Sequence, residues 1–459
     1  MKSETAKVLH RVAGRPMVEH VLIAARQAGA DPSVVVVGVQ GSQVQARLEK
    51  FDEGGTVLFA EQKKRLGTGD AVMAARAALS RFRGDVLILC GDVPALPASA
   101  LKTLVKEHRK SGAALTVLTA ILDDPQGYGR IVRDGEGRIA AIVEHKDATT
   151  EQRRIAEINT GTYCADWKKL LAVLEEIRPN NAQGEYYLTD AVKLLIEKGA
   201  RASAVVHGDH REAMGVNGRR HLALVGRVMR EQVLGRLMDR GVTIIDPDST
   251  FIDATVTVGR DTTIYPGVTL EGETRIGKHC VVHGGTRLRS VRVGNHTVIL
   301  DGTIAVDSKI GAKCQVGPYC HLRPGTALGD ECKVGNFVET KKCSLGKGAK
   351  ASHLSYLGDA VIGRGVNIGA GTITCNYDGV NKHQTILEDG VFIGSDTQLV
   401  APVTVGRGAY VGAGSTVTEN VPNDALAITR VSQRNIEGWA ERKRQRMARE
   451  KKRRAKAAK

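Results

Sequence analysis

The sequence predicts two domains of different class, an α/β domain over residues 1–219 and a parallel β-solenoid over residues 241–440. Helical and strand-like patterns alternate along the first half, which favours a parallel sheet covered by helices. In the second half aliphatic residues recur every six positions, a period that fits neither a helix nor one regular strand. A charged helical stretch at 220–240 is expected to link the domains, and residues 441–459 form a basic tail.

The first domain shows one clear helical stretch and two apolar runs. Residues 15–29 are expected to form a helix, and residues 33–38 and 85–90 to form buried strands, the second ending just before Asp92. Ligands of open α/β sheets sit at the carboxyl ends of strands. An Asp at such an end is by itself more often a turn residue than a metal ligand. Residues 66–69, Leu-Gly-Thr-Gly before an expected helix, could present backbone N–H groups to a phosphate.

The six-residue period defines the second domain. One repeat is the length of a short strand and a turn, about 20 Å at ~3.3 Å per residue, so three sides would make a triangular coil of 18 residues. The residue two positions before each aliphatic one is small or β-branched, and both point inward because i and i−2 share a strand face. The aliphatic positions are Val258, Ile264, Leu270, Ile276, Val282, Leu288, Ile310, Val316, Leu322, Leu328, Val334, Ile362, Ile368, Ile393, Leu399, Val405, Val411 and Val417. The small positions are Thr262, Val268, Thr274, Cys280, Cys314, Cys320, Thr326, Cys332, Val403, Ala409 and Ser415.

The repeat is interrupted between Thr374 and Ile393. The segment 375–384 is polar and rich in turn residues, and excursions from a regular scaffold are where function concentrates. The spacing predicts a parallel solenoid and leaves its handedness open.

Composition and charge exclude several classes of function. The net charge is +16, but residues 441–459 hold eleven Lys or Arg and two Glu, so the tail carries +9 and the rest +7. Such a run is usually a solvated or frayed helical end. A nucleic-acid partner is therefore not expected, and a nucleic-acid anchor stands only as an alternative. No run approaches the ~20 apolar residues of a membrane span, and the N-terminus lacks the pattern of a signal peptide.

The cysteines indicate a reducing compartment. Eight are scattered along the chain without a CxxC pair, which predicts a cytoplasmic protein and argues against a zinc site. Four of them, Cys280, Cys314, Cys320 and Cys332, fall on inner positions of the repeat and are predicted to be small core residues rather than metal ligands.

Several long motifs match a known family, between Lys7 and Trp439. They are Gln62 with Leu66-Gly-Thr-Gly69, Gly127-Tyr-Gly-Arg130, Val143-Glu-His-Lys-Asp147, Asn180-Asn-Ala-Gln-Gly-Glu-Tyr-Tyr187, Val334-Gly-Asn-Phe-Val-Glu339, Gly369-Ala-Gly-Thr-Ile-Thr-Cys-Asn-Tyr-Asp378 and Gly394-Ser-Asp-Thr-Gln398. In them the chain resembles the bifunctional bacterial enzymes that join a glucosamine-1-phosphate N-acetyltransferase to an N-acetylglucosamine-1-phosphate uridylyltransferase. The resemblance implies a Rossmann-like uridylyltransferase (pyrophosphorylase) domain, then a left-handed parallel β-helix that forms a homotrimer.

The resemblance also implies two reactions. Acetyl-CoA would acetylate the amine of glucosamine-1-phosphate, and UTP would then convert the product to UDP-N-acetylglucosamine and pyrophosphate, for peptidoglycan and lipopolysaccharide precursors. In the solenoid, His353 matches the general base of the family, a role suited to histidine. The matches to the sugar-phosphate site are Arg323, Lys341, Tyr356 and Asn367. The matches around acetyl-CoA are Ala370, Asn376, Tyr377, Lys382, Ser395, Ala413 and Arg430.

In the first domain, Asp92 and Asn217 match the two side chains that hold Mg²⁺ in the family. Two oxygen ligands, with phosphate and water completing the shell, suit this hard cation. The matches to the UDP-sugar site are Lys7, Gln62, Gly67, Thr68, Cys90, Gly91, Asp92, Gly129, Glu144, Asn159 and Asn217.

The chain departs from the family at its beginning. The family opens with a buried strand and a glycine-rich loop, Leu-x-Ala-Gly-x-Gly-Thr-Arg-Met, and this sequence starts at what would be the final Met. Without that strand, sheet hydrogen bonds would lack partners, each costing roughly 1–3 kcal/mol. Either the start is misassigned or the chain is truncated, and for the chain as written we expect acetyl transfer to survive and uridylyl transfer to be lost or severely weakened.

Three other interpretations remain open from the sequence. The chain could be an acetyltransferase whose nucleotidyltransferase-like domain is inactive for lack of that N-terminus. The first domain could instead bind a nucleotide sugar without turnover. The solenoid could be a scaffold without catalysis, in which case substitution of His353 would change nothing.

Overall fold

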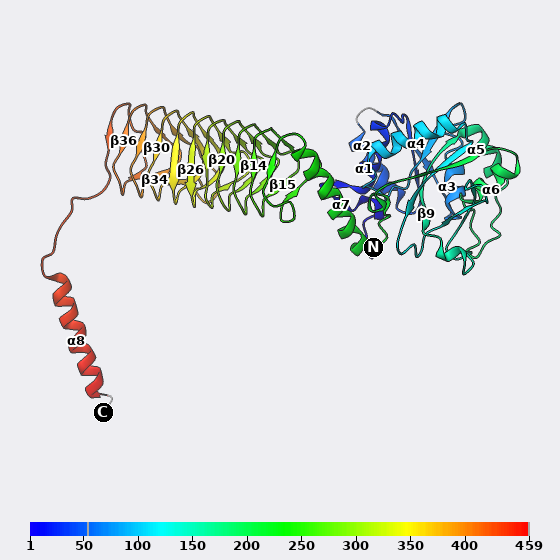
Figure 1. The fold of residues 1–459 in the computed structure, drawn as a ribbon. Helices are drawn as coiled ribbons and strands as arrows, with labels where there is room; N and C mark the ends of the chain where they lie inside the picture. The colour runs from blue at the N-terminus through cyan, green and yellow to red at the C-terminus, as the bar shows by residue number, and fades with distance from the viewer. Residues whose placement is uncertain (53–54, 458–459) are drawn as a thin grey trace. The chain divides into compact units, whose positions relative to one another are not determined.

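The computed structural model describes residues 1–52 and 55–457, with side chains to Arg454, and divides into two compact units, Met1–Thr274 and Arg275–Lys459 (Figure 1). The first unit contains an α/β part, a long helix and the first strands of the solenoid. The second contains the remaining solenoid strands and a C-terminal helix. The domain boundaries expected from the repeat, at 219/220 and 240/241, stay predictions.

Helices of the α/β part lie close to the expected positions. The helix expected at 15–29 is α1 and the helix expected at 220–240 is α7, so both helices are confirmed, while the role of α7 as a linker stays a prediction. The helices are α1 (Met17–Gln27), α2 (Gly41–Phe51), α3 (Thr68–Ala74), α4 (Ala98–Ser111), α5 (Trp167–Leu174), α6 (Asp190–Glu197) and α7 (Arg219–Met238), with short 3-10 turns at Lys7–Leu9, Gln152–Arg154 and His210–Ala213.

The α/β sheet is mixed rather than parallel. The long strand β9 (Glu157–Asp166) runs antiparallel to β5 (Asp85–Ile88), β6 (Leu115–Ile121) and β7 (Arg130–Arg133). Parallel pairing occurs between β10 (Ala202–Val206) and β6 and between β3 (Ser33–Val37) and β4 (Val57–Glu61). The other strands are β8 (Ile139–Val143), antiparallel to β7, and the hairpin of β1 (Arg11–Val12) and β2 (Arg15–Pro16).

Helices cover both faces of the larger sheet. On one face, Leu115 and Val117 of β6 pack with Trp167 and Leu170 of α5. On the other face, Leu118 packs with Leu101 and Leu104 of α4. Alternate residues of β6 thus enter opposite cores, as the two-residue period of a strand requires.

The two apolar strands expected to be buried are only half-buried. Each residue of β3 and of β5 keeps part of its surface exposed. Among the described residues, β3 pairs only with β4 and β5 only with β9, so each has one edge without a strand neighbour. The prediction of full burial was wrong. The side chains of a strand are buried by the layers that cover the two faces of its sheet, and that cover is incomplete over β3 and β5. The expectation of unpartnered sheet edges is met.

The solenoid consists of short parallel strands stacked coil on coil. In the first unit these strands are β11 (Thr243–Ile244), β12 (Phe251–Ile252), β13 (Thr257–Val258), β14 (Thr263–Ile264) and β15 (Thr269–Glu271). In the second unit one sheet contains β17 (Val281–Val282), β20 (Val298–Ile299), β23 (Gln315–Val316), β26 (Lys333–Asn336), β28 (Lys350–His353), β30 (Asn367–Ile368), β33 (Phe392–Ile393), β36 (Tyr410–Val411) and β38 (Leu426–Ala427). A second sheet supplies the other two sides with β16 (Arg275–Ile276), β18 (Arg287–Arg289), β19 (Arg292–Val293), β21 (Ile304–Val306), β22 (Lys309–Ile310), β24 (His321–Leu322), β25 (Ala327–Leu328), β27 (Glu339–Leu345), β29 (Tyr356–Ile362), β31 (Ile373–Cys375), β32 (Thr385–Leu387), β34 (Gln398–Val400), β35 (Val403–Val405) and β37 (Thr416–Val417).

The predicted core of the solenoid is confirmed. All the aliphatic and small positions named from the repeat are buried, including the four cysteines. All eight cysteines of the chain are free thiols. The left-handed winding stays an expectation from the resemblance.

Not every side of a coil has six residues. Lys350 pairs with Asn367, 17 residues further on, whereas Gln315 pairs with Lys333, 18 residues further on. The shorter coils turn one corner on a single residue at positive φ, such as Asp307 (φ 44°) or Lys342 (φ 45°). A left-handed residue reverses direction compactly, so one side shortens to five residues while the strand register is kept.

One glycine permits the close approach of two coils beside the predicted catalytic residue. A Cβ on Gly335 would lie 1.9 Å from the carbonyl oxygen of Ser352 on the next coil. We expect Gly335→Ala to destabilise the solenoid by about 1–3 kcal/mol or more, measured by urea denaturation. Gly235→Ala in α7, where a Cβ meets nothing within 4 Å, should be neutral or stabilising; equal loss in both variants would contradict the explanation.

Within the described part of the chain, no helix is both long and apolar enough to cross a membrane.

Candidate functional site

His353 is held at the end of strand β28 by a neighbour on the preceding coil. The register pairs it with Asn336 at the end of β26, and Nδ1 of His353 lies 2.9 Å from Oδ1 of Asn336. Because the amide oxygen can only accept, Nδ1 is the donor, and in the neutral ring this makes Nε2 the acceptor nitrogen. The ring is exposed, so Nε2 is available to a ligand as a proton acceptor.

The next strand begins directly beyond this corner and carries the polar residues of the second side. Tyr356, at the start of β29, pairs with Glu339 at the start of β27. Glu339 accepts a hydrogen bond from Arg323 on the coil before, at 2.7 Å. This stacking follows from the parallel register, which places outward residues of successive coils one above another.

Three cations gather beside these residues. The pKa of Lys341 is lowered from its ordinary value, first by Lys382 beside it and then by Arg323. Like charges drawn together without a matching number of carboxylates favour an anionic ligand, because its charge relieves their repulsion. Lys382 was matched to the acetyl-CoA set, yet its ammonium lies with the residues matched to the sugar phosphate.

The excursion from the repeat is a compact hairpin over residues 376–384. Tyr377 and Lys382 form an antiparallel bridge at its base. Asp378 organises the tip by accepting hydrogen bonds from the backbone N–H groups of Val380 and Asn381 and from His383. These donors lower the pKa of Asp378 to about 2, the backbone bond from Asn381 first. The hairpin thus holds Lys382 in place and leaves the Tyr377 ring 60% exposed.

One edge of the solenoid aligns most of the other expected acetyl-CoA residues. A Cβ on Gly369 would lie against the backbone N of Ser395, and a Cβ on Gly394 would lie against the backbone N of Ala413. The corners at Gly369, Ser395 and Ala413 therefore stack on three successive coils. The guanidinium of Arg430 donates to the carbonyl of Ala413 at 2.7 Å. Ala370 accepts a hydrogen bond from Asp396 N at 2.7 Å on the same edge.

Two expected ligand residues lie apart from these groups. Asn376 is nearly buried and donates to Asp359 at 2.5 Å, which ties the hairpin to β29. Asn367 lies on β30, paired with Lys350 of β28. Within the described residues, no hydrogen bond joins the side chain of Asn367 to the three cations.

In the α/β part, Asp92 and Asn217 converge on one point. Nζ of Lys7 lies 2.5 Å from Oδ2 of Asp92 and 3.0 Å from Oδ1 of Asn217. The backbone carbonyl of Asp92 also accepts from Val216 N at 2.9 Å, which fixes the two segments together. Two hard oxygen donors aimed at one cationic centre fit a divalent metal ion, and the ammonium of Lys7 marks the place. Among the residues described, no group of three or more His, Cys, Asp or Glu is placed to hold a metal ion.

A second wall of this site runs from β9 to the β7–β8 hairpin. Asn159 donates its backbone N–H to the carbonyl of Gly129 at 2.9 Å, and its Oδ1 accepts from Gly161 N at 2.9 Å. Glu144 lies beside Gly129, and burial raises the pKa of its carboxyl group, partly offset by a hydrogen bond from Thr189. Cys90 reaches this wall through a 3.5 Å contact from Sγ to the Gly161 carbonyl.

The third wall is the loop before α3. Gln62 donates to the carbonyl of Gly67 at 3.0 Å and to Asp70 at 2.8 Å. Gly67 has φ 114° and no room for a side chain, since a Cβ would lie 2.5 Å from the Tyr186 carbonyl. Thr68 accepts from Leu188 N at 3.0 Å. The segment at 186–189 therefore links this wall to Glu144, through Leu188 and Thr189.

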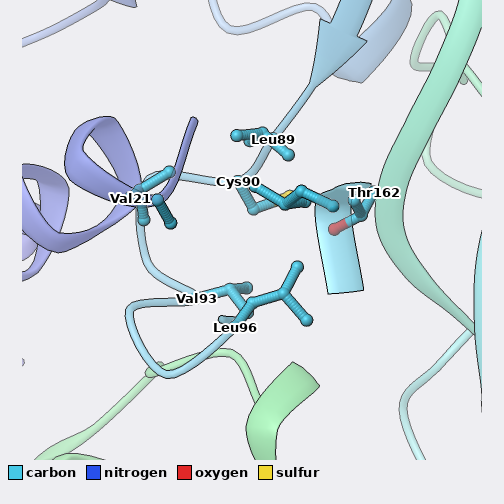
Figure 2. Close-up of a pocket in the computed structure, with 8 residues that line it drawn as sticks. Val21, Leu89, Cys90, Val93, Leu96 and Thr162 are labelled. Carbon is cyan, nitrogen blue, oxygen red and sulfur yellow. The ribbon is translucent and has the colours of Figure 1, made fainter. Parts of the chain in front are cut away.

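Cys90 and Gly91 stand between this site and the core. Figure 2 shows Cys90 and Leu89 near Val21 and Thr162. The cavity that these residues line has a volume of about 10 Å³. That volume is near one water molecule, so the cavity is a packing defect behind the site and not the substrate pocket. Burial raises the pKa of the Cys90 thiol to about 12, with the charge of Asp92 adding to the effect, so the thiol stays protonated.

Several residues of the sites were not singled out from the sequence. In the solenoid they are Asn336, Glu339 and Asp359, each bonded to an expected site residue. In the α/β part, Tyr128 has a pKa raised by burial and by the charge of Asp92. Asn336, Glu339 and Tyr128 lie inside the motifs quoted for the resemblance. They could have been found as outward-pointing motif residues that neighbour a residue already matched to a site.

Comparisons with known proteins match both halves of the chain. A family model described as nucleotidyl transferase matches residues 2–211, and one described as bacterial transferase hexapeptide (six repeats) matches residues 307–342 and 384–419. The chain is 52% identical to the bifunctional protein GlmU of Trichlorobacter lovleyi, covering 97% of this chain and 96% of that protein. It is 50% identical to the proteins of the same name from Pelobacter propionicus and Heliobacterium modesticaldum, covering 96% of this chain and 95% of each of them.

Proposed function

The chain belongs to the family of the bifunctional protein GlmU, and from that premise we propose that each of its two sites carries one of two consecutive reactions. The solenoid transfers the acetyl group of acetyl-CoA to the amine of glucosamine-1-phosphate. The α/β part transfers a uridylyl group from UTP to the resulting N-acetylglucosamine-1-phosphate, giving UDP-N-acetylglucosamine and pyrophosphate. Similarity of about 50% across nearly the whole chain does not favour the alternative of an acetyltransferase alone. We therefore propose uridylyl transfer for this chain in place of the loss expected from the sequence alone.

The observation that carries the first assignment is the hydrogen bond from His353 to Asn336. It leaves Nε2 as the acceptor for the proton that the attacking amine must lose. The amine nitrogen forms a bond to the thioester carbon, the C–S bond breaks, and the thiolate of CoA leaves. Backbone N–H groups along the edge that contains Ser395 and Ala413 are the candidates for stabilising the tetrahedral oxyanion.

The three cations are proposed to bind the phosphate of the sugar. Arg323 is oriented by Glu339, and the repulsion among Arg323, Lys341 and Lys382 falls when a dianion arrives. Tyr356 lies one coil above Glu339 and can bond a sugar hydroxyl. Asn367 is proposed to contact the sugar. The residues proposed to lie around the acetyl-CoA are Ala370, Asn376, Tyr377 and Arg430.

Replacing one of these cations should weaken substrate binding more than chemistry. We expect Lys341→Gln to raise KM for glucosamine-1-phosphate by roughly 10- to 100-fold, because a hydrogen bond between charged groups contributes about 1.5–3 kcal/mol. The KM for acetyl-CoA should change little. Lys309→Gln removes the same charge from an exposed position of β22 and should leave both constants unchanged. Steady-state kinetics with each substrate varied would decide, and a selective rise of the acetyl-CoA constant would contradict the assignment.

The α/β site is proposed to hold Mg²⁺ between Asp92 and Asn217. When bound there, the ion supplies charge stabilisation to the reacting phosphates. Lys7 is the residue that must move, since its ammonium lies between the two oxygens, and its charge is then free to contact a phosphate. The sugar-phosphate oxygen attacks the α-phosphate of UTP, and the bond to pyrophosphate breaks. Gln62, Gly67 and Thr68 form one wall for the nucleotide.

The wider setting follows the family. We propose that the solenoid is left-handed and assembles as a homotrimer, that the acetyltransferase domain spans 241–440, and that the enzyme works in the cytoplasm on precursors of the cell wall. Both activities can be assayed separately on residues 1–459, as CoA release and as pyrophosphate release. Absence of CoA release from the folded protein would refute the acetyltransferase assignment.

A further inference from the structure

The C-terminal helix α8 (Trp439–Ala457) is a charged element without an assigned role. It follows a segment, residues 428–438, that has no regular structure, and every side chain described in it is exposed (Figure 1). Its described side-chain contacts stay within the helix. They are the stacking of Lys443 over Trp439, the bond from Gln445 to Glu441 and the ion pair of Arg446 with Glu450. The frayed end expected from the sequence is therefore a continuous helix of 19 residues.

The helix places four arginines in one stripe. Arg442, Arg446, Arg449 and Arg453 are spaced by four, three and four residues. At 3.6 residues per turn they fall within about 60° of one another and extend over about 16 Å. Glu441 and Glu450 fall outside this stripe on the same geometry. The four positions, named here the arginine stripe, present one sign of charge and five N–H donors each.

The stripe is unfavourable for the helix alone. Arg442 and Arg446, and likewise Arg449 and Arg453, are like charges at i and i+4, which destabilise an isolated helix by a few tenths of a kcal/mol per pair. No apolar face offsets this, because Trp439 and Met447 are the only large apolar side chains among residues 439–454. A polyanion lying along the stripe would remove the repulsion and order the arginines.

The chemistry of the stripe distinguishes between polyanions. An interfacial membrane helix needs a broad apolar face opposite its charges, and α8 has none. Arginine forks bind phosphate bidentately. Residues 439–454 contain nine Lys or Arg and two Glu, a net +7, or one charge per about 3.4 Å of helix at 1.5 Å per residue. Phosphates of one nucleic-acid strand follow at about the same interval, although along the stripe alone the arginines are about 4.5–6 Å apart.

We propose that the arginine stripe of α8 binds the phosphate backbone of nucleic acid without reading its sequence. The activity is independent of acetyl and uridylyl transfer, since no stripe residue belongs to either site. It would attach the enzyme to a nucleic-acid surface through a segment that its two catalytic sites do not use.

The test compares two quadruple variants of the full chain that lose the same charge. One removes the stripe (Arg442, Arg446, Arg449 and Arg453 to Gln). The matched control removes four cations from the other side of α8 (Lys443, Arg444, Lys451 and Arg454 to Gln). Binding to a labelled RNA duplex is measured by fluorescence anisotropy over a range of KCl. Circular dichroism and CoA release verify that folding and acetyl transfer are unchanged.

For four phosphate contacts, the association constant of the natural sequence should fall about 150-fold when the salt rises fourfold. The stripe variant should lose most of the affinity and of the salt dependence, whereas the control keeps a slope near that of the natural sequence. Equal losses in both variants would show that net charge alone acts and would overturn the proposal. So would absence of binding, or binding to phosphatidylglycerol vesicles in place of the duplex.

Discussion

Replacing His353 by Ala is expected to lower kcat of acetyl transfer by about 10²- to 10⁴-fold, the usual contribution of a general base. The hydrogen bond from Nδ1 to Asn336 orients the ring and, in the neutral tautomer, makes Nε2 the acceptor for the proton of the amine. Release of CoA, followed by its reaction with a thiol reagent, measures the loss. Uridylyl transfer from UTP to added N-acetylglucosamine-1-phosphate should be unchanged.

A matched control separates the base from its surroundings. His296→Ala removes another solenoid histidine, one stacked on His279 at a corner of earlier coils, and should leave acetyl transfer intact. Asn336→Ala should lower kcat less than His353→Ala, because the ring remains but its orientation is lost. If His353→Ala kept full activity, the solenoid would be a scaffold or would use a different base.

Replacing Asp92 by Ala is expected to lower pyrophosphate release by about 100-fold or more while acetyl transfer continues. Several kcal/mol of charge stabilisation depend on the metal ion, and the remaining protein ligand would be the amide of Asn217. The variant should also need more Mg²⁺ for half of its residual rate. A magnesium titration of pyrophosphate release measures both effects.

The control for this variant removes a carboxylate elsewhere in the same unit. Asp134 caps a hairpin turn through Arg138, so Asp134→Ala should change folding stability more than the magnesium requirement. A first unit that only binds a nucleotide sugar would show no effect of Asp92→Ala on catalysis, and that result would reject the uridylyltransferase assignment.

The core of the solenoid could be predicted from the sequence because every coil buries its side chains at the same positions of the repeat. Every hexad position from Val258 to Val417 that was assigned inward is buried. The six-residue period does not show which corners of the solenoid turn on a single residue. The left-handed conformations of Asp307 and Lys342 depend on the fit between neighbouring coils, which a single-coil pattern does not contain.

The sites were predicted residue by residue, but their grouping was not. The resemblance placed Lys382 around the acetyl-CoA and the acceptor without saying which residue it lies beside, and the hairpin carries it to Lys341. That position depends on the bonds that Asp378 makes inside the hairpin, which no periodic pattern encodes. Likewise Lys7 was expected at the nucleotide, and its place between Asp92 and Asn217 appears only when three distant segments are brought together.

Among the described residues, β3 and β5 each have one edge without a strand neighbour, and their apolar side chains stay half-exposed. Lys7 and Asn217 nevertheless meet at Asp92, where the backbone of Val216, just before Asn217, bonds to the carbonyl of Asp92.

The two proposed sites are expected to work separately, with a diffusible product passing from the first to the second. The direct test is to supply glucosamine-1-phosphate, acetyl-CoA, UTP and Mg²⁺ to the His353→Ala variant, to the Asp92→Ala variant, and to a mixture of the two. Mass spectrometry should find UDP-N-acetylglucosamine in the mixture and almost none with either variant alone. Product from His353→Ala by itself, or none from the mixture while the unsubstituted chain forms it, would contradict the account.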